Sequence, residues 1–255
     1  MAKVIVIGAG PAGIMAAIHA SKKHNVTILD GNDRIGKKLF ITGKGRCNVT
    51  NSKDISEFFD YIPGNPHFLY SALYSYTNED TMNFFENVGI KLKVERGGRV
   101  FPMSDKSSDI IKGLSIGLKE SNVQVKLNSK VTNIIYDANK IVGVEINNST
   151  KLYGDYFIIA TGGASYPLTG SRGEGQKFAK KLGHTIIELK PSLVPIELNE
   201  SWLKDLMGLS LKNISLSILK NNKVLYKNQG EMLFTNYGIS GPLVLSGSRY
   251  VKNEG

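Results

Sequence analysis

The spacing G-x-G-x-x-G, which suits the binding of a pyrophosphate, occurs near the N-terminus and is carried by Gly8, Ala9, Gly10, Pro11, Ala12 and Gly13. In such a segment the first glycine allows a tight turn, the second lets a phosphate approach the backbone, and the third lets a helix pack closely on a strand. The phosphates then lie at the positive end of the helix dipole. Asp30, twenty-two positions after Gly8, can accept hydrogen bonds from ribose hydroxyls. The sequence therefore predicts a dinucleotide site.

The segments around these glycines are those that must position such a site. Residues 3–7 form a β-branched run typical of a buried parallel strand, residues 11–23 carry the apolar stripe of a helix, and residues 25–30 predict a second strand. Two parallel strands joined by a helix make a right-handed βαβ unit. The alternative is a glycine-rich turn that binds nothing, and this context disfavours it.

Asp30 is followed by a long polar segment, residues 31–65, where an NAD dehydrogenase would continue into more strand–helix repeats. A loop of this length inside a compact domain is usually functional. Four cations lie within ten of its residues, with no acid among them: Lys37, Lys38, Lys44 and Arg46. Such a loop can wrap a pyrophosphate and a ribityl chain, with its glycines close to a flat ring. A solvated basic loop is the alternative interpretation.

Further along, the patterns predict helices at residues 68–88, 107–120 and 175–182. Between the second and the third of these helices, three short strands are predicted at residues 123–131, 132–138 and 140–146, followed by a buried strand at residues 155–163. Turns are expected at residues 137–139 and 147–148. Gly183 fits the left-handed position just after the last of these helices.

The pattern changes after Lys190. Residues 209–219 and 224–234 alternate apolar and polar side chains, as antiparallel strands with one buried face do. Pro242 would occupy the first position of a short helix. The sequence thus predicts an α/β fold with a Rossmann-like domain of residues 1–190, containing a parallel sheet and a small antiparallel meander. A β-rich second domain would occupy residues 191–255.

Composition narrows the function classes. The 255 residues include 32 basic and 22 acidic side chains, a net charge of +10, which favours contact with the phosphates of a nucleotide, RNA or anionic lipid without choosing among them. A single cysteine excludes a disulfide framework, and the absence of metal-ligand spacing predicts no metal. No apolar run reaches the ~20 residues that span a bilayer. The N-terminus has neither the basic region nor the cleavage site of an export signal, so we expect a cytoplasmic protein without membrane contact.

These features resemble the FAD-dependent oxidoreductases of the two-dinucleotide-binding, glutathione reductase-like superfamily. That superfamily adds a downstream arginine and glycine and an A-T-G strand end, which match Arg34, Gly36, Ala160, Thr161, Gly162 and Gly163. More narrowly, five blocks in the same order resemble the aminoacetone oxidase-like (BaiN/YhiN) flavoprotein family: GKKLFITGKGRCNVTN, GRVFPMSDKSSDI, GEGQKFAKKLGH, PSLVPIEL and GEMLFTNYGISGP.

The family resemblance implies FAD as the cofactor and a flavin-binding domain interrupted by a barrel-like insert. It also implies a C-terminally truncated chain, because relatives return to the first domain after the insert. Val131 would meet the adenine through its backbone, and Gly173 and Glu174 would close near the cofactor. Taken together, the expected cofactor-binding residues are Gly8, Ala9, Gly10, Pro11, Ala12, Gly13, Asp30, Gly31, Arg34, Gly36, Lys37, Lys38, Thr42, Gly43, Arg46, Cys47, Asn48, Val131, Ala160, Thr161, Gly162, Gly163, Gly173 and Glu174.

In a flavoprotein the flavin itself transfers hydride or electrons, so no side chain need be the redox agent. Cys47 is a weak catalytic candidate because the adjacent Arg46 would lower a thiol pKa. A small residue packed against the cofactor is the favoured alternative.

Three functions follow from these observations. The first is an FAD-dependent oxidoreductase acting on a small amine or enone, with NAD(P)H as a transient electron donor. The second is a flavin-dependent reductase of a uracil base in ribosomal RNA, which the positive charge fits. The third is a non-catalytic flavin-binding remnant. The sequence does not determine the oligomeric state.

Overall fold

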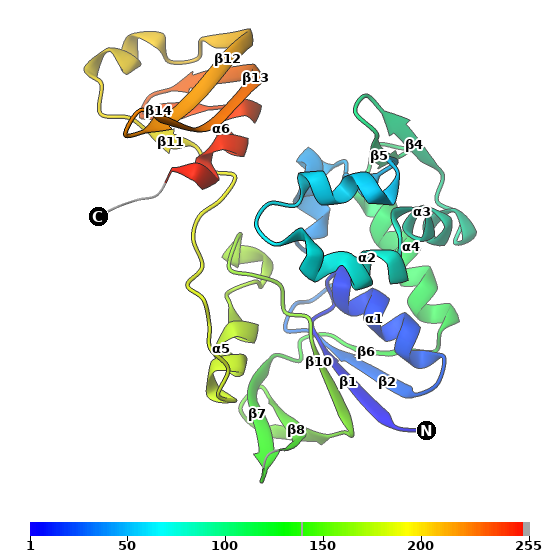
Figure 1. Ribbon diagram of the computed structural model, residues 1–255. Coiled ribbons are helices and arrows are strands. Elements are labelled where there is room, and N and C mark those ends of the chain that lie inside the picture. Colours follow the sequence, from blue (N-terminus) through cyan, green and yellow to red (C-terminus); the bar gives the residue numbers. More distant parts are fainter. Residues whose placement is uncertain (139, 252–255) are drawn as a thin grey trace. The chain divides into compact units, whose positions relative to one another are not determined.

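A computed structural model of the chain describes residues 1–138 and 140–251. They fall into two compact units, the first of which is Met1–Ile186, while the second begins at Ile187. Figure 1 shows the course of the chain through both units. The boundary lies between residues 186 and 187, whereas the apolar pattern of the sequence changes near Pro191. Within the described residues, no helix combines the length and the apolar character that a membrane crossing requires.

A four-stranded parallel sheet forms the centre of the first unit. Its strand order is β10 (Tyr156–Ile159), β1 (Lys3–Ile7), β2 (Asn25–Leu29) and β6 (Gln124–Lys126). Helix α1 (Pro11–Ser21) connects β1 to β2, so the predicted βαβ unit is confirmed. The β-branched residues of β1 are buried in two separate clusters, which confirms that both faces of this strand are covered.

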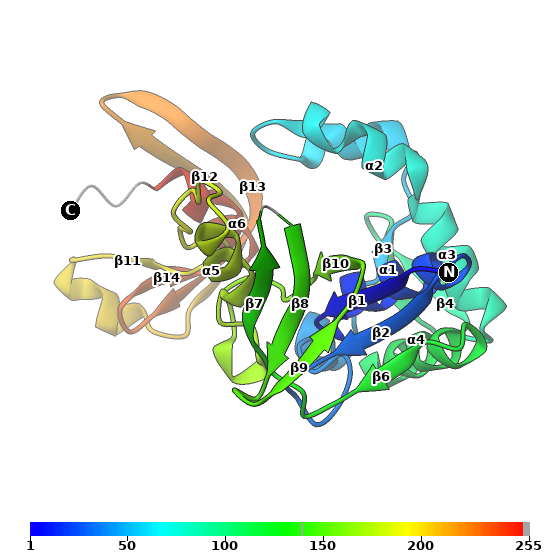
Figure 2. The ribbon, with the colours of Figure 1, turned by 90° about the horizontal axis from the view of Figure 1, so that it is seen from below.

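Different elements cover the two faces of the sheet (Figure 2). On one face, Val4 and Val6 pack with Ile14 of α1 and with Leu114 of α4 (Ser107–Glu120). On the other face, Ile5 and Ile7 belong to a cluster that includes the meander β7 (Val131–Asp137), β8 (Lys140–Ile146) and β9 (Thr150–Tyr153), and Phe178 of α5 (Glu174–Lys181). The helices predicted for residues 107–120 and 175–182 are confirmed. Gly183 lies after α5 with a φ of 88°, in the left-handed region.

The predicted strand of residues 123–131 is wrong, because this segment belongs to two sheets. Residues Gln124–Lys126 pair in parallel with β2, whereas Val131 begins the antiparallel meander. Between them Asn128 adopts a φ of 51°, and its N–H donates to the Asn32 carbonyl. A left-handed residue interrupts an extended strand, so the chain changes sheets here. Asn147 and Asn148 form the expected left-handed turn, whereas the turn expected at 137–139 includes Asn139, which lies outside the described residues.

The helix expected over residues 68–88 is also wrong, because it is interrupted. A 3₁₀ turn (Pro66–Leu69) leads into α2 (Tyr70–Ser75), and α3 (Asn78–Asn87) begins separately after Thr77. Thr77 is extended, its Oγ1 accepts from the Asp80 N–H at 3.1 Å, and Asp80 accepts from the Thr77 N–H at 2.8 Å. This reciprocal capping box starts a new helix at this position.

The polar segment of residues 31–65 contains short regular elements. Two 3₁₀ segments, Leu39–Gly45 and Ile55–Tyr61, flank the strand β3 (Thr50–Asn51). β3 pairs with β5 (Arg99–Pro102), which in turn pairs with β4 (Leu92–Glu95). The β4–β5 hairpin, which follows later in the chain, therefore fixes the middle of this segment.

The second unit has an antiparallel sheet in the order β11 (Ile196–Glu197), β14 (Gly238–Ser240), β13 (Lys223–Thr235) and β12 (Ser210–Lys220). The two alternating strands predicted from the sequence are confirmed as β12 and β13. Helix α6 (Pro242–Gly247) has Pro242 in its first turn, and its Val244 is buried with Met232 and Ile239. In the described residues this sheet is open and does not close into a barrel. Short 3₁₀ segments lie at Pro167–Thr169 in the first unit, and at Ser201–Leu206 and Ser248–Tyr250 in the second.

The turn between β1 and α1 brings backbone segments into very close contact. Gly8 has a φ of 111°, and a Cβ there would lie 2.4 Å from the Ala160 carbonyl oxygen. A Cβ on Gly13 would lie 2.0 Å from the Gly8 carbonyl oxygen. Both obstacles are backbone atoms, which cannot rotate away as a side chain can. Helix, turn and β10 can approach this closely only because both residues are glycines.

This geometry predicts that Gly13→Ala strongly destabilises the first unit, since α1 must move away from the strand to admit the methyl group. Gly10→Ala is the matched control, because a Cβ on Gly10 would meet no atom within 4 Å. We expect a fall in melting temperature of several degrees for Gly13→Ala and little change for Gly10→Ala, measured by circular dichroism without cofactor. Equal melting temperatures for the two variants would contradict the close packing described here.

Candidate dinucleotide-binding site

A cavity of about 600 Å³ opens within the first unit at the carboxyl ends of β1, β2 and β10. This edge of a parallel sheet is where ligands commonly bind. Most of the residues that the sequence predicted to bind a cofactor line it, namely Gly8, Ala9, Gly10, Pro11, Ala12, Asp30, Gly31, Gly36, Lys37, Lys38, Val131, Ala160, Thr161, Gly162, Gly163 and Glu174. The fold thus brings together residues that are up to 166 positions apart in the chain.

The amino end of α1 can hold an anion. The first N–H groups of a helix have no acceptor within it, and at this end of α1 the residues Gly10, Pro11 and Ala12 line the cavity. Gly10 caps the helix in an extended conformation, with open space where a side chain would stand. No carboxylate occupies the first turn of α1. A diphosphate fits this position both sterically and electrostatically.

Asp30 connects the end of β2 to the glycine turn. Its Oδ2 accepts from the Ala9 N–H at 2.6 Å, and its Oδ1 accepts from the backbone N–H and the side-chain amide of Asn32 at 2.8 and 2.9 Å. A carboxylate has about four acceptor sites, so these three bonds leave one for a ribose hydroxyl. The acid therefore has a structural role that the sequence pattern does not indicate.

The amino end of α1 and the end of β2 at Asp30 form two walls of the cavity, and the segment that follows β10 forms the third. Gly173 is the N-cap of α5 with a φ of 76°, and its N–H donates to the Gly163 carbonyl at 3.3 Å. Gly173 itself does not line the cavity, whereas Glu174 does, and a Glu174 carboxylate oxygen accepts from the Arg172 N–H at 3.0 Å. On the opposite side, Lys38 reaches the hydroxyl of Ser165 at 3.3 Å.

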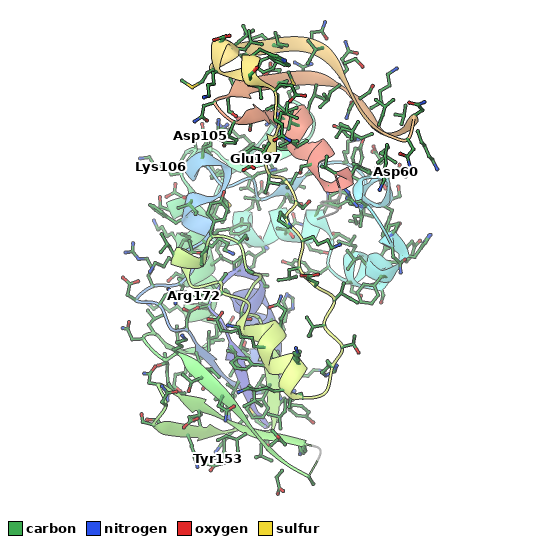
Figure 3. All side chains as sticks on the ribbon, turned by 90° about the vertical axis from the view of Figure 1, so that its left-hand side faces the viewer. Asp60, Asp105, Lys106, Tyr153, Arg172 and Glu197 are labelled. Atoms are coloured by element: carbon green, nitrogen blue, oxygen red, sulfur yellow. The ribbon has the colours of Figure 1, made fainter. Side chains whose placement is uncertain are left out.

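Several lining residues escaped the sequence analysis: Ile7, Leu29, Asn32, Lys130, Thr169, Gly170, Ser171, Arg172 and Phe178. Figure 3 labels Arg172 on this part of the first unit. The Asn32 side chain donates to the Thr169 carbonyl at 3.3 Å, and a Cβ on Gly170 would lie 2.6 Å from its nitrogen. Gly170 also has a φ of 98°, so both space and backbone require glycine. In the sequence, the sign of this close approach between two distant loops is a single residue, Gly170.

The remaining predicted residues lie outside the cavity lining. Gly13 packs behind it, against Gly8, and Arg34 pairs with the exposed Asp33. The Thr42 hydroxyl donates to the Leu39 carbonyl at 2.7 Å. Turned toward its neighbours, the Asn48 amide nitrogen donates to the carbonyls of Val100 and Thr50 at 3.1 and 2.9 Å.

Arg46 faces neither the cavity nor the neighbouring thiol. Its guanidinium pairs with Glu95 and Asp105. The hydrogen bond from Arg46 lowers the pKa of Glu95, and those from Lys93 and then Arg46 lower the pKa of Asp105. Both carboxyl groups are therefore ionised at neutral pH.

The prediction that Arg46 activates Cys47 is wrong. Cys47 is buried in the core beside α1, in a left-handed conformation with a φ of 58°. Burial raises the pKa of its thiol, and a weaker hydrogen bond with Thr42 opposes this only in part. The thiol is therefore protonated at neutral pH and behaves as a packed residue. Among the described residues, no group of three or more histidine, cysteine or acidic side chains is placed to hold a metal ion.

Known proteins resemble the chain over most of its length. It is 31% identical over 254 residues to the 3-dehydro-bile acid delta(4,6)-reductase of Clostridium scindens, covering 98% of the chain and 61% of that protein. It is 34% identical over 251 residues to the ribosomal RNA dihydrouridine synthase of Haemophilus influenzae, covering 96% and 61%. The chain thus spans about three-fifths of the length of these relatives.

The fold is that of a solved flavoprotein. The open conformation of a flavocytochrome c3 fumarate reductase matches 83% of this chain and 47% of its own, with a TM-score of 0.52 and 20% identity. The HI0933-like protein Rossmann domain model matches residues 2–241. This match confirms the family resemblance found in the five sequence blocks, and the chain belongs to the HI0933-like Rossmann-domain family.

Proposed function

We propose that the whole protein is an FAD-dependent oxidoreductase and that this chain supplies its cofactor-binding domain. The observation that carries the proposal is the open amino end of α1, which faces a cavity bounded by Asp30 and the segment after β10. Bound FAD would supply hydride or electron transfer through its isoalloxazine ring. The protein's contribution is then binding, orientation and electrostatics.

In this proposal each wall of the cavity holds one part of the cofactor. The N–H groups at Ala12 and Gly13 would bind the diphosphate, with Lys37 and Lys38 adding positive charge at the rim. The free acceptor site of Asp30 would take a ribose hydroxyl. The backbone at Val131, where β7 begins, would meet the adenine. This leaves the backbone of residues 161–163 and the loop of residues 42–48 for the rest of the cofactor.

The names of the relatives favour a reduction. A bile acid delta(4,6)-reductase and a dihydrouridine synthase would both add hydrogen to a carbon–carbon double bond, which reduced flavin does by hydride transfer. We favour a small cyclic enone as the substrate. A uracil base in ribosomal RNA is the second candidate, supported by the net charge of +10 and by the second relative.

The cofactor assignment predicts that a side chain on Gly10 prevents FAD binding without unfolding the protein. Gly10→Val should weaken FAD binding at least about tenfold, because its methyl groups fill the space in front of the helix, and Gly10→Ala should have an intermediate effect. Flavin fluorescence titration measures the affinity, and the melting temperature without FAD is the control. Failure of the unaltered protein to bind FAD, or normal binding by Gly10→Val, would refute the assignment.

The buried thiol predicts that Cys47 is not a catalytic group. We expect the folded protein to react with iodoacetamide far more slowly than a free cysteine at pH 8, since the thiol is both buried and protonated. Cys47→Ala should retain flavin reduction by NADPH. Rapid labelling of the native protein, or loss of flavin reduction in a folded Cys47→Ala variant, would restore the catalytic interpretation.

The two substrate classes give different products. With NADPH present, we expect the protein to consume a 3-keto-4-ene steroid and to leave unmodified ribosomal RNA without dihydrouridine, as measured by mass spectrometry of both substrates. Dihydrouridine formation, together with RNA affinity that falls steeply with salt, would instead support the RNA candidate.

A further inference from the structure

Arg46 uses almost all of its hydrogen-bonding capacity on the protein itself. Its Nε donates to Asp105 Oδ1 at 2.8 Å, and its Nη2 donates to the same oxygen at 2.5 Å. Nη2 also donates to Glu95, and Nη1 reaches the second oxygen of Glu95 at 3.5 Å. Four of the five guanidinium donors are therefore engaged. The face of the guanidinium lies over the Phe101 ring, 4.3 Å from its centroid.

A second cation completes this cluster. Lys93 on β4 contacts Asp105 Oδ2 at 2.6 Å and Glu95 Oε1 at 3.7 Å. The side chains of Arg46, Glu95 and Lys93 are only 35%, 27% and 26% exposed. Charge pairs that are arranged as a network and partly shielded from water hold their geometry better than isolated surface pairs. The four residues, which we call the Arg46 cluster, thus connect the loop to the β4–β5 hairpin and to the turn before α4.

The loop that Arg46 anchors has an unfavourable backbone conformation. Gly43, Lys44, Gly45 and Cys47 all have a positive φ, between 56° and 84°. Lys44 and Cys47 carry side chains, so this conformation is strained at both positions. Strain of this kind persists only where the surroundings impose it, and it concentrates at ligand sites. Arg46 lies between the two strained residues.

A second contact restrains the start of the same loop. The Ser107 hydroxyl, at the first position of α4, donates to the Phe40 carbonyl at 2.7 Å. Gly36, before the loop, donates its N–H to the Ala9 carbonyl in the glycine turn at 2.9 Å. The loop is therefore held at its start by α4 and at its end by the Arg46 cluster, and it continues directly from the turn at the cavity.

We propose that Arg46 is a positioning residue, whose ion pairs with Glu95 and Asp105 hold residues 39–48 in the conformation that receives the flavin, and that it does not contact the cofactor itself. This inference rests on the proposed FAD-binding function. It differs from the sequence-based expectation, in which Arg46 is one of the cofactor-binding residues. The guanidinium of Arg46 is thus engaged by the protein framework, through Glu95 and Asp105, and is not left to attract phosphate by its charge.

The experiment compares Arg46→Ala, Arg46→Lys and Lys106→Ala in the full chain. Lys106 is the matched control, because it is an exposed cation next to Asp105 in the sequence, and Figure 3 labels both residues. The first readout is hydrogen exchange of residues 39–48 without FAD, and the second is FAD affinity by fluorescence titration. We expect Arg46→Ala to accelerate exchange in this loop and to weaken FAD binding about tenfold. Arg46→Lys should recover part of both effects, and Lys106→Ala should match the unaltered protein.

A double-mutant cycle separates positioning from direct contact. If Arg46 acts through Glu95, the double variant Arg46→Ala/Glu95→Ala should bind FAD no more weakly than Arg46→Ala alone. Fully additive losses, or an unchanged exchange rate in Arg46→Ala, would overturn the proposal. If the unaltered protein binds no FAD, the proposed function fails. The exchange measurement needs no cofactor, so it would still decide whether Arg46 anchors the loop.

Discussion

The close contact of backbones at the β1–α1 turn is the constraint on which the rest of the first unit depends. A helix can present its unpaired N–H groups to a ligand only if it begins immediately beyond the strand. Here Gly13 lies against the Gly8 carbonyl, and Gly8 lies against the Ala160 carbonyl. Because three backbone segments meet here without intervening side chains, glycines make up much of this part of the cavity wall. Main-chain groups bind phosphate without regard to side-chain rotamers, which makes this part of the site preorganised.

Hydrogen bonds between distant loops complete the cavity. Asp30 fixes the glycine turn through the Ala9 N–H, and Asn32 reaches the Thr169 carbonyl on the far wall. The Gly31–Lys38 segment thus has contacts on both sides of the cavity, with Lys38 adding a contact to Ser165. Each of these bonds is modest by itself, yet together they fix the distance between the end of β2 and the segment after β10. A ligand between them therefore encounters walls that are already in place.

The local parts of this architecture could be predicted from the sequence. The βαβ unit, α4, α5 and the alternating strands β12 and β13 follow from apolar periodicity and glycine placement, which depend on near neighbours. The two errors in secondary structure arose at single residues, Asn128 and Thr77, whose backbone conformations divide otherwise continuous patterns. In the candidate site, the residues next to the glycine fingerprint could be predicted from spacing alone. Asn32, Gly170 and the orientation of Arg46 could not, because their partners lie 49 to 138 positions away.

The pairing of β1 with β10 has a consequence for how the molecule forms. Val4 pairs with Tyr156, so most of the first unit lies between these two paired residues in the sequence. Contacts of such long range form slowly, because the entropy of closing the intervening chain opposes them. During synthesis on the ribosome, the glycine turn emerges early but gains its third wall only after residues 160–174 have left the exit tunnel. The cavity is therefore complete only once the sheet has closed, and a nucleotide that contacts all three walls would bind a domain that has already formed.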